Sequence, residues 1–165
     1  MSAPLHHARR AVLLAGVLAL SACALPPRTV QDADQGMWSG RLALQVEGEQ
    51  AQSFSASFEL RGSPERGELS LFTPLGATAA QLRWEPGTAW LRADGRERRY
   101  ASIEDLSADA TGTPLPLAAL FDWLAGRAAD VPGWQADLSR VADGRISARR
   151  SMPLPTAELR IVFAP

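Results

Sequence analysis

The sequence contains few of the side chains that carry most enzyme chemistry. It has two histidines, His6 and His7, and one cysteine, Cys23, and all three lie close to the N-terminus. The rest of the chain lacks the parts of a His-activated nucleophile, a Cys nucleophile or a His/Cys zinc site, and it cannot form an internal disulfide. It also has no Gly-rich phosphate loop of the Walker or dinucleotide type. We therefore expect neither a metal nor another cofactor.

Carboxylates, serines and Tyr100 are the remaining candidates for catalysis. Acidic neighbours occur at Glu104 and Asp105 and at Glu47 and Glu49. Neighbouring side chains of a strand point to opposite faces of the sheet, so a solvated surface explains such residues more simply than an active site. We expect a protein that is not an enzyme. A carboxylate-based glycan hydrolase stays open as an alternative, and a polar, acid-lined cleft would favour it.

The net charge is small. Beyond residue 22 the chain has 15 arginines and 18 Asp and Glu residues, which gives a formal side-chain charge of −3 (15 − 18). Proteins that bind nucleic acid usually present a basic surface, so we expect no nucleic-acid partner. The 143 residues that follow residue 22 (165 − 22) have the size of one ordinary domain.

The N-terminus has the three parts of a secretory signal. Arg9 and Arg10 give a basic start, residues 11–20 form an apolar run, and small residues follow at positions 21 and 22. A transmembrane helix needs about 20 apolar residues, so this run is too short to span a bilayer. We therefore expect residues 1–22 to be a signal peptide.

The end of this signal resembles the lipobox of bacterial lipoproteins. It reads Leu20-Ser21-Ala22-Cys23. The resemblance implies cleavage before Cys23, attachment of lipid to its thiol and acylation of the new N-terminus, so that acyl chains hold the protein on a membrane. Lipoproteins with Asp directly after the cysteine tend to stay in the inner membrane. Ala24 stands there instead, which implies the outer membrane.

Residues 23–37 are predicted to be the lipidated N-terminus and a flexible tether. They are polar, include two adjacent prolines and two aspartates, and lack any apolar periodicity, which is typical of linkers. From Trp38 onward the pattern changes. We expect residues 38–165 to form one domain.

Apolar and polar residues alternate over most of this domain, as in strands with one buried face. The first run contains Leu42, Leu44 and Val46, and the second spans residues 53–61. Residues 48–50 are a predicted turn between the two. Further strands are predicted at 68–73, 77–84, 89–93, 96–101, 134–138, 145–149 and 158–163.

Two helices are predicted between the sixth and seventh strands. Ser102 can cap the first, whose apolar side would contain Ile103 and Leu106. Pro116 can begin the second helix and Gly126 can end it. The second helix has the i, i+3, i+4, i+7 spacing of an amphipathic helix in Leu117, Leu120, Phe121 and Leu124.

These elements predict a mainly β fold of the α+β class, with an antiparallel meander, two helices and further strands. The helices must bury their apolar sides against the apolar face of the sheet. A curved, partly closed sheet with the helices over one mouth is the simplest arrangement, and it would enclose a hydrophobic cavity. The predicted cavity lining is Leu42, Leu44, Phe54, Phe58, Leu71, Leu82, Leu117, Leu120, Phe121 and Leu124. The same residues would form an ordinary core if the interior were filled.

Several motifs occur together in a specific order and spacing. They are the lipobox, Trp38-x-Gly40-Arg41, Ser53-Phe54-x-Ala56-x-Phe58, Leu69-x-Leu71, Thr73-Pro74-Leu75-Gly76, Tyr100-Ala101 with Glu104-Asp105-Leu106, and Gly112-x-Pro114-x-Pro116-Leu117-x-x-Leu120 with Trp123-Leu124-x-Gly126. Through these motifs most of the chain resembles the LolB family of outer-membrane lipoprotein receptors. The last third matches more loosely and is short for the family, which leaves open whether one or two C-terminal strands are missing.

The resemblance implies a half-open antiparallel β-barrel with a two-helix lid over a hydrophobic cavity. It also implies a receptor on the periplasmic face of the outer membrane, which accepts acylated lipoproteins from the periplasmic carrier LolA and inserts them into the inner leaflet. We expect a monomer held by its lipid anchor. A structural lipoprotein that docks on an envelope assembly is a second alternative, and a filled core would favour it.

The family also has a protruding loop with an exposed leucine that is important for membrane incorporation. By motif this residue corresponds to Leu75. Pro74 and Gly76 bracket it in a predicted turn between two strands, where an apolar residue is unexpected. A leucine that folds back into the core, or that is exposed by chance, would explain the same sequence. With the resemblance we favour a loop, Pro74 to Gly76, that acts in membrane insertion or acyl-chain transfer.

Overall fold

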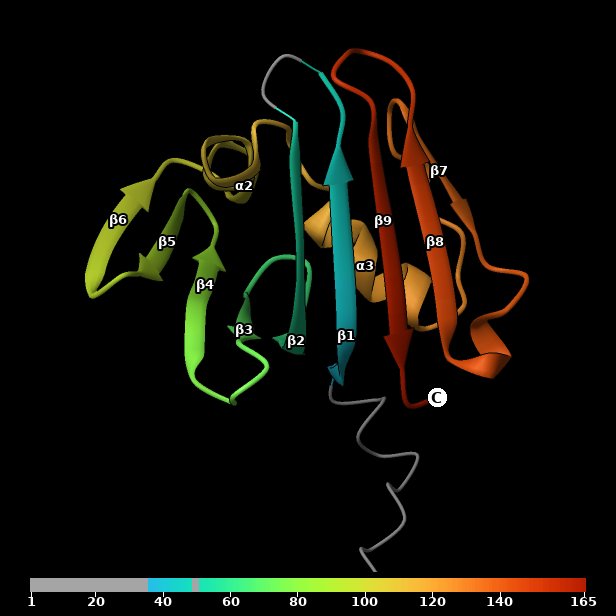
Figure 1. Ribbon diagram of the computed structural model, residues 1–165, viewed down its shortest axis with the longest axis horizontal. Helices are drawn as coiled ribbons and strands as arrows, with labels where there is room; N and C mark the ends of the chain where they lie inside the picture. The colour runs from blue at the N-terminus through green and yellow to red at the C-terminus, as the bar shows by residue number, and fades with distance from the viewer. Residues whose placement is uncertain (1–35, 49–50) are drawn as a thin grey trace, which may run out of the picture.

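The computed structural model describes residues 36–48 and 51–165, and within them nine strands form one antiparallel sheet (Figure 1). The order across the sheet is β6-β5-β4-β3-β2-β1-β9-β8-β7. β1 pairs with both β2 and β9, so the first and last strands of the domain are neighbours. The strands are β1 (Met37–Val46), β2 (Gln52–Gly62), β3 (Gly67–Phe72), β4 (Thr78–Glu85), β5 (Thr88–Ala93), β6 (Arg96–Tyr100), β7 (Trp134–Asp137), β8 (Arg145–Arg150) and β9 (Ala157–Phe163).

These strands lie where the alternation of apolar and polar residues predicted them, with bounds that differ by about one residue. β1 begins at Met37, which the sequence placed in the tether, and β6 ends at Tyr100, one residue earlier than predicted. Part of the predicted turn at 48–50 lies outside the described residues, as do the predicted signal peptide and most of the predicted tether.

One face of the sheet is apolar, because alternate residues of a strand point to the same side. In β1, Leu42 and Leu44 are buried, and the neighbouring β9 places Ile161 and Leu159 directly opposite them. The intervening residue Arg160 points the other way and is exposed. The apolar face must be covered, and the two helices cover it.

Both predicted helices are present. α2 (Ile103–Thr111) begins as expected, because the Ser102 side chain accepts a hydrogen bond from the Asp105 backbone N–H at 3.0 Å. α3 (Leu117–Leu124) follows Pro116, and a short 3₁₀ helix η1 (Val141–Asp143) precedes β8. Figure 1 shows α3 behind the central strands of the sheet, and α2 contacts β5 and β6 at the other end.

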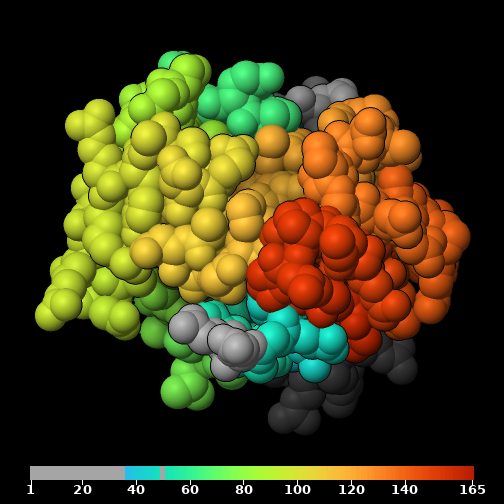
Figure 2. Space-filling model, turned by 90° about the horizontal axis from the view of Figure 1, so that it is seen from above, coloured from blue at the N-terminus to red at the C-terminus, as the bar shows by residue number. Residues whose placement is uncertain are grey.

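The core lies between the apolar face of the sheet and the helices. Trp123 and Leu106 are completely buried there. The Phe121 ring lies edge-on to the rings of Trp38 and Trp84, with centroids 5.6 and 6.2 Å apart. Seen from above, the yellow-to-gold helical segment lies between the lime strands and the orange-to-red C-terminal strands (Figure 2). This open sheet with helices on one side is consistent with the predicted half-open barrel.

Candidate functional site

An apolar pocket of about 260 Å³ lies between the sheet and the helices. One wall comes from six consecutive strands, β1 to β6, and from β9; the other comes from α2, α3 and the loop that joins them. Leucine and alanine dominate this wall, and no Asp or Glu borders it. The lining residues are Leu42, Leu44, Phe54, Leu69, Leu71, Ala80, Leu82, Leu91, Ala93, Arg98, Ser107, Ala110, Thr111, Leu115, Leu117, Leu120 and Leu159.

Seven of the ten residues predicted to line a cavity border this pocket. They are Leu42, Leu44, Phe54, Leu71, Leu82, Leu117 and Leu120. Phe58, Phe121 and Leu124 are buried elsewhere in the core and do not border it. Phe121, for example, fills the space between Trp38 and Trp84. The structure thus separates cavity lining from plain core, whereas an acyl-chain role for the seven stays a prediction.

Sequence reasoning missed part of the pocket wall. Leu91 and Leu159 lie at alternating positions of their strands, so the period of two could have identified them. Leu115 gave no such signal, because it lies between two prolines in a segment predicted only as a loop. The structure buries this residue between the helices, where it contributes to the pocket wall.

Two hydroxyl groups in the pocket wall are used to fix the loop between α2 and α3. The Ser107 Oγ donates to the Glu104 carbonyl and accepts from the Leu115 N–H, each at 3.0 Å. The Thr111 Oγ1 lies 2.9 Å from the carbonyl oxygens of Ser107 and Thr113. These hydroxyls are therefore satisfied within the protein, and they do not need a polar ligand.

A polar cluster joins the edge strand β6 to α2 beside the pocket. Arg98 Nη1 lies 2.7 Å from Asp109 Oδ2, and the Tyr100 hydroxyl donates to the same oxygen at 2.7 Å. Desolvation, followed by the hydrogen bond to Asp109, raises the pKa of Tyr100 above its ordinary value, although Arg98 acts in the opposite direction. Because Arg98 also lines the pocket, this cluster lies at the pocket's edge.

The predicted loop at Pro74 to Gly76 is a tight turn between β3 and β4. Gly76 N–H donates to the Thr73 carbonyl at 2.9 Å, and Thr73 N–H donates to the Ala77 carbonyl at 2.9 Å. Gly76 has a φ of 83°, a conformation that costs glycine nothing and other residues energy. Leu75 is 96% exposed, more than any other large apolar side chain in the described ranges. The reading in which Leu75 folds back into the core is therefore wrong.

This turn lies at one end of the sheet. In Figure 1 the β3–β4 connection, in bright green, reaches the lower edge of the molecule, and β1 begins at the same edge. The loop between β8 and β9, in red, lies at the upper edge. The turn that contains Leu75 and the start of β1 therefore lie at the same end of the sheet.

Cys23, the predicted lipid attachment site, lies outside the described residues. In the part of the chain that the structure describes, no helix has the length and hydrophobicity needed to cross a membrane. Within the same ranges no three His, Cys, Asp or Glu side chains are grouped so that they could hold a metal ion.

The fold and the pocket define a class of protein: a mainly β domain whose open sheet and two helices enclose an apolar pocket. The family model described as "Outer membrane lipoprotein LolB" matches residues 36–160, which is most of this domain. The chain belongs to the LolB family. The motifs that the sequence shares with that family thus reflect true membership.

Curated relatives agree with this assignment. An "Outer-membrane lipoprotein LolB" of Bordetella petrii is 35% identical over 173 aligned residues, covering 87% of this chain and 86% of that protein. The protein of the same name from Chromobacterium violaceum is 33% identical over 145 residues, covering 84% and 77%. That of Halorhodospira halophila is 41% identical over 135 residues, covering 72% and 65%.

Proposed function

We propose that the protein is a lipoprotein receptor, which accepts acylated lipoproteins from the periplasmic carrier LolA and inserts them into the outer membrane. The observation that carries the proposal is the apolar pocket between sheet and helices, in a member of the LolB family. Acyl chains are the ligands that such a wall suits, since each CH₂ moved from water into an apolar site contributes about 0.8 kcal/mol.

The size of the pocket supports a lid role for the helices. Its volume of about 260 Å³ is below the ~300–1,000 Å³ typical of pockets for drug-sized ligands. A multiply acylated ligand therefore needs more space than the closed structure offers. Moving α2 and α3 away from the sheet would provide it, because these helices and their connecting loop form one whole wall.

The anchor and the exposed turn support delivery to a membrane. Acylation of Cys23 would hold the domain on the periplasmic face of the outer membrane, within reach of the inner leaflet. Leu75 projects into solvent on a stiff turn, and burying a leucine side chain in an apolar phase contributes about 1.5–3 kcal/mol. We assign membrane or acyl-chain contact to this turn.

Two alternatives have less support. A structural lipoprotein would be expected to have a filled core, whereas this one has a pocket. A carboxylate-based enzyme would need an acid-lined cleft, and no Asp or Glu borders the apolar pocket. Transfer down an affinity gradient from carrier to receptor needs no chemical step.

A pocket-filling substitution tests acyl-chain binding. Ala80 is a half-buried residue of the pocket wall, whereas Ala43 is half-buried on the opposite face of β1. In the full chain with Cys23→Ala, Ala80→Phe should weaken binding of a fluorescent fatty-acyl probe by about tenfold or more, since it displaces roughly two CH₂ groups. Ala43→Phe should leave the affinity unchanged. Equal affinities in both variants would disprove binding in this pocket.

A further inference from the structure

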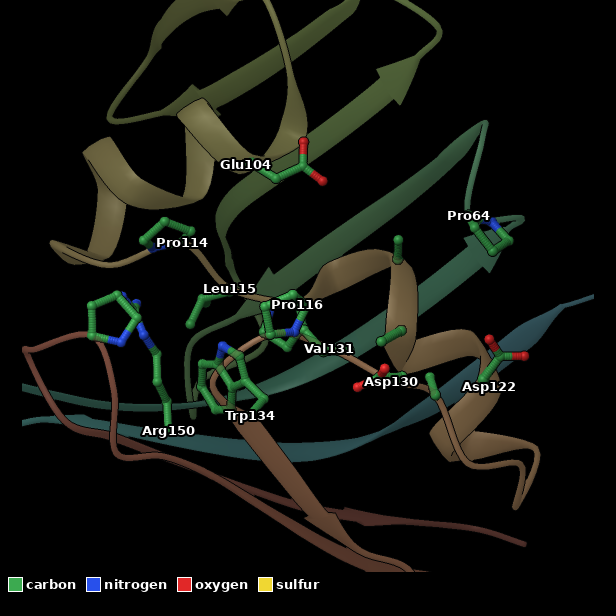
Figure 3. Close-up of a pocket in the computed structure, with 15 residues that line it drawn as sticks. Pro64, Glu104, Pro114, Leu115, Pro116, Asp122, Asp130, Val131, Trp134 and Arg150 are labelled. Atoms are coloured by element: carbon green, nitrogen blue, oxygen red, sulfur yellow. The ribbon is translucent and has the colours of Figure 1, made fainter.

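A second, larger hollow lies on the other side of α3. Its volume is about 530 Å³. It is bordered by the β2–β3 loop, α2, the α2–α3 loop, α3, the segment that leads into β7, the start of β7, the end of β8 and the β8–β9 loop. We call it the proline groove, because five prolines line it: Pro64, Pro114, Pro116, Pro132 and Pro153. Figure 3 shows these walls, and in Figure 2 the surface is hollowed between the yellow and the orange-to-red segments.

A buried arginine without a partner lines this groove. Arg150, at the end of β8, is only 6% exposed, and its Nη1 has no hydrogen-bond partner among the described residues. Thr113 Oγ1 and Trp123 Nε1 are the other buried side-chain atoms without a partner in the described ranges, but neither residue borders this groove or the apolar pocket. Figure 3 shows the Arg150 guanidinium beside Trp134, directed toward the loop of Pro114 and Leu115.

A buried guanidinium nitrogen without a partner is costly, because Arg150 Nη1 has lost its water without gaining a hydrogen bond. The planar fork of donors of a guanidinium matches a carboxylate or a phosphate. A buried polar group without a partner in a native protein calls for an explanation such as a bound ion, so Arg150 points to an anionic ligand in the groove. The neighbouring Arg149 is different, since it faces outward and lies 3.9 Å from Glu158.

The chain's own acidic residues offer little as internal partners. Three lie outside the described ranges, Asp32, Asp34 and Glu49. Arg150 of β8 pairs with Ala157 of β9, which in turn pairs with Val46 of β1. Val46 is nine residues from Met37, the first residue of β1, so the two are about 30 Å apart along the strand. Three to five residues of chain span at most about 18 Å, so Asp32 and Asp34 cannot reach it. Thermal unfolding of Arg150→Met tests whether Glu49 is an internal partner of Arg150.

The rest of the wall fits an extended polypeptide. Proline has no backbone N–H, and it keeps its carbonyl acceptor. The Pro64 and Pro116 carbonyls already accept from Trp84 Nε1 and the Leu120 N–H, which leaves those of Pro114, Pro132 and Pro153 as candidate acceptors for peptide N–H groups. Extended, proline-containing segments dock in grooves with aromatic walls, and Trp134 supplies an aromatic ring to this wall. Three carboxylates also line the groove, those of Glu104, Asp122 and Asp130, and in Figure 3 they lie away from Arg150. A purely anionic ligand such as free phosphate would meet repulsion there.

The groove and the apolar pocket share one wall residue. Leu115 borders both hollows, one on each side of the α2–α3 loop. We propose that the proline groove binds the extended segment that follows the acylated cysteine of a cargo lipoprotein, with an acidic side chain of that segment on Arg150. This inference rests on the proposed function, and it adds a peptide subsite beside the acyl pocket.

The tether of this chain supplies a probe of the required chemistry. A fluorescent, non-acylated peptide with the sequence of residues 24–37 contains two prolines and two aspartates. In the full chain with Cys23→Ala, fluorescence anisotropy should show saturable binding of this peptide. Arg150→Met should weaken it about tenfold or more, because a buried charge-assisted pair is lost, and Arg149→Met, the matched control, should not. Changing both aspartates of the peptide to asparagine should weaken binding equally.

Several results would overturn the inference. Equal binding by the Arg150→Met and Arg149→Met proteins would do so, as would equal binding of the Asp and Asn peptides, which needs no variant protein. Inorganic phosphate that binds as tightly as the peptide would reduce the groove to a small-anion site. Thermal unfolding gives a further test: Arg150→Met should unfold at the same or a higher temperature, and a lower one would reveal an internal partner such as Glu49.

The acyl probe separates the two proposals. It contains no peptide, so its binding reports on the apolar pocket alone. Intact acyl binding with no peptide binding would remove the groove from the mechanism and leave the receptor function standing. Peptide binding without acyl binding would leave the groove as a peptide site and remove the acyl pocket.

Discussion

Leu75→Glu is the change that most directly tests how the exposed turn acts. The leucine is 96% exposed, and the hydrogen bonds of the turn use the main chain of Thr73, Gly76 and Ala77 and the Thr73 hydroxyl, not the Leu75 side chain. Full burial of a leucine in a bilayer or among acyl chains contributes about 1.5–3 kcal/mol, which corresponds to roughly 10- to 150-fold in an equilibrium constant. Glu removes this gain and adds a charge that resists desolvation.

The same change should hardly affect folding. Surface substitutions away from special features usually alter the free energy of unfolding by less than about 0.5 kcal/mol. We therefore expect Leu75→Glu to unfold at nearly the wild-type temperature and to accept lipoprotein from the carrier normally. Delivery from the receptor into liposomes should fall at least tenfold, within the range given by leucine burial.

Leu154→Glu is the matched control, because Leu154 is 72% exposed in the loop between β8 and β9, at the opposite edge of the molecule. It should deliver lipoprotein normally. Delivery assays and thermal unfolding of both variants test whether the Leu75 turn acts in delivery. An equal fall for Leu154→Glu would show that the turn has no special role, and unfolding of Leu75→Glu would show that the structure of the turn depends on its leucine.

Three further predictions concern the strands, the β6–α2 cluster and the anchor. Gly40→Ala should lower the free energy of unfolding by about 1–3 kcal/mol, because a Cβ there would overlap the Val162 carbonyl oxygen; an unchanged thermal midpoint would contradict this packing. Tyr100 is the single tyrosine, so tyrosinate absorbance should titrate it above pH 10.0. Because folding raises the pKa of Tyr100, its contribution to the free energy of unfolding is complete at pH values below the pKa of the unfolded chain. This contribution is lost as pH rises through the pKa of the folded protein, and Tyr100→Phe should abolish that loss. Cys23→Ala should abolish acylation and release the protein to the periplasm, and mass spectrometry that finds unmodified Cys23 in membrane-bound protein would refute the anchor.

The strands and helices were predictable because burial imposes a period on the sequence. In β2, for example, Ala56, Phe58 and Leu60 are buried while the serines and charged residues between them are more exposed, so the buried face of the strand follows from the pattern alone. The helix start at Ser102 was equally readable, because a capping side chain acts on its own backbone three residues away. These are local rules, and they need no knowledge of the tertiary structure.

The cavity itself was less predictable, because a hollow is a property of tertiary packing. Nothing in sequence separates Leu120, which borders the pocket, from Phe121 and Leu124, which are core. The two arginines that end β8 show a second reason why parts of the site could not be predicted from sequence. Alternation places Arg150 on the same face as Ile146 and Ala148, but a charged residue at the end of a predicted strand is normally assigned to solvent. Only the structure shows that it is buried.

The energetics of opening explain how cargo could enter without a nucleotide. Separating the helices from the sheet would break the Arg98–Asp109 pair, whose side chains are half exposed and which contributes about 0–1 kcal/mol. The Tyr100–Asp109 hydrogen bond adds about 0.5–1.5 kcal/mol. At about 0.8 kcal/mol for each CH₂, burial of four CH₂ groups offsets these two polar contacts. Opening also exposes apolar side chains of the helices, among them Leu106, Phe121 and Trp123, so the acyl chains must replace the apolar contacts that these residues lose. In the proposed lid role acyl chains are therefore both the cargo and the replacement for this packing, and the packing of the helices on the sheet keeps the empty pocket closed.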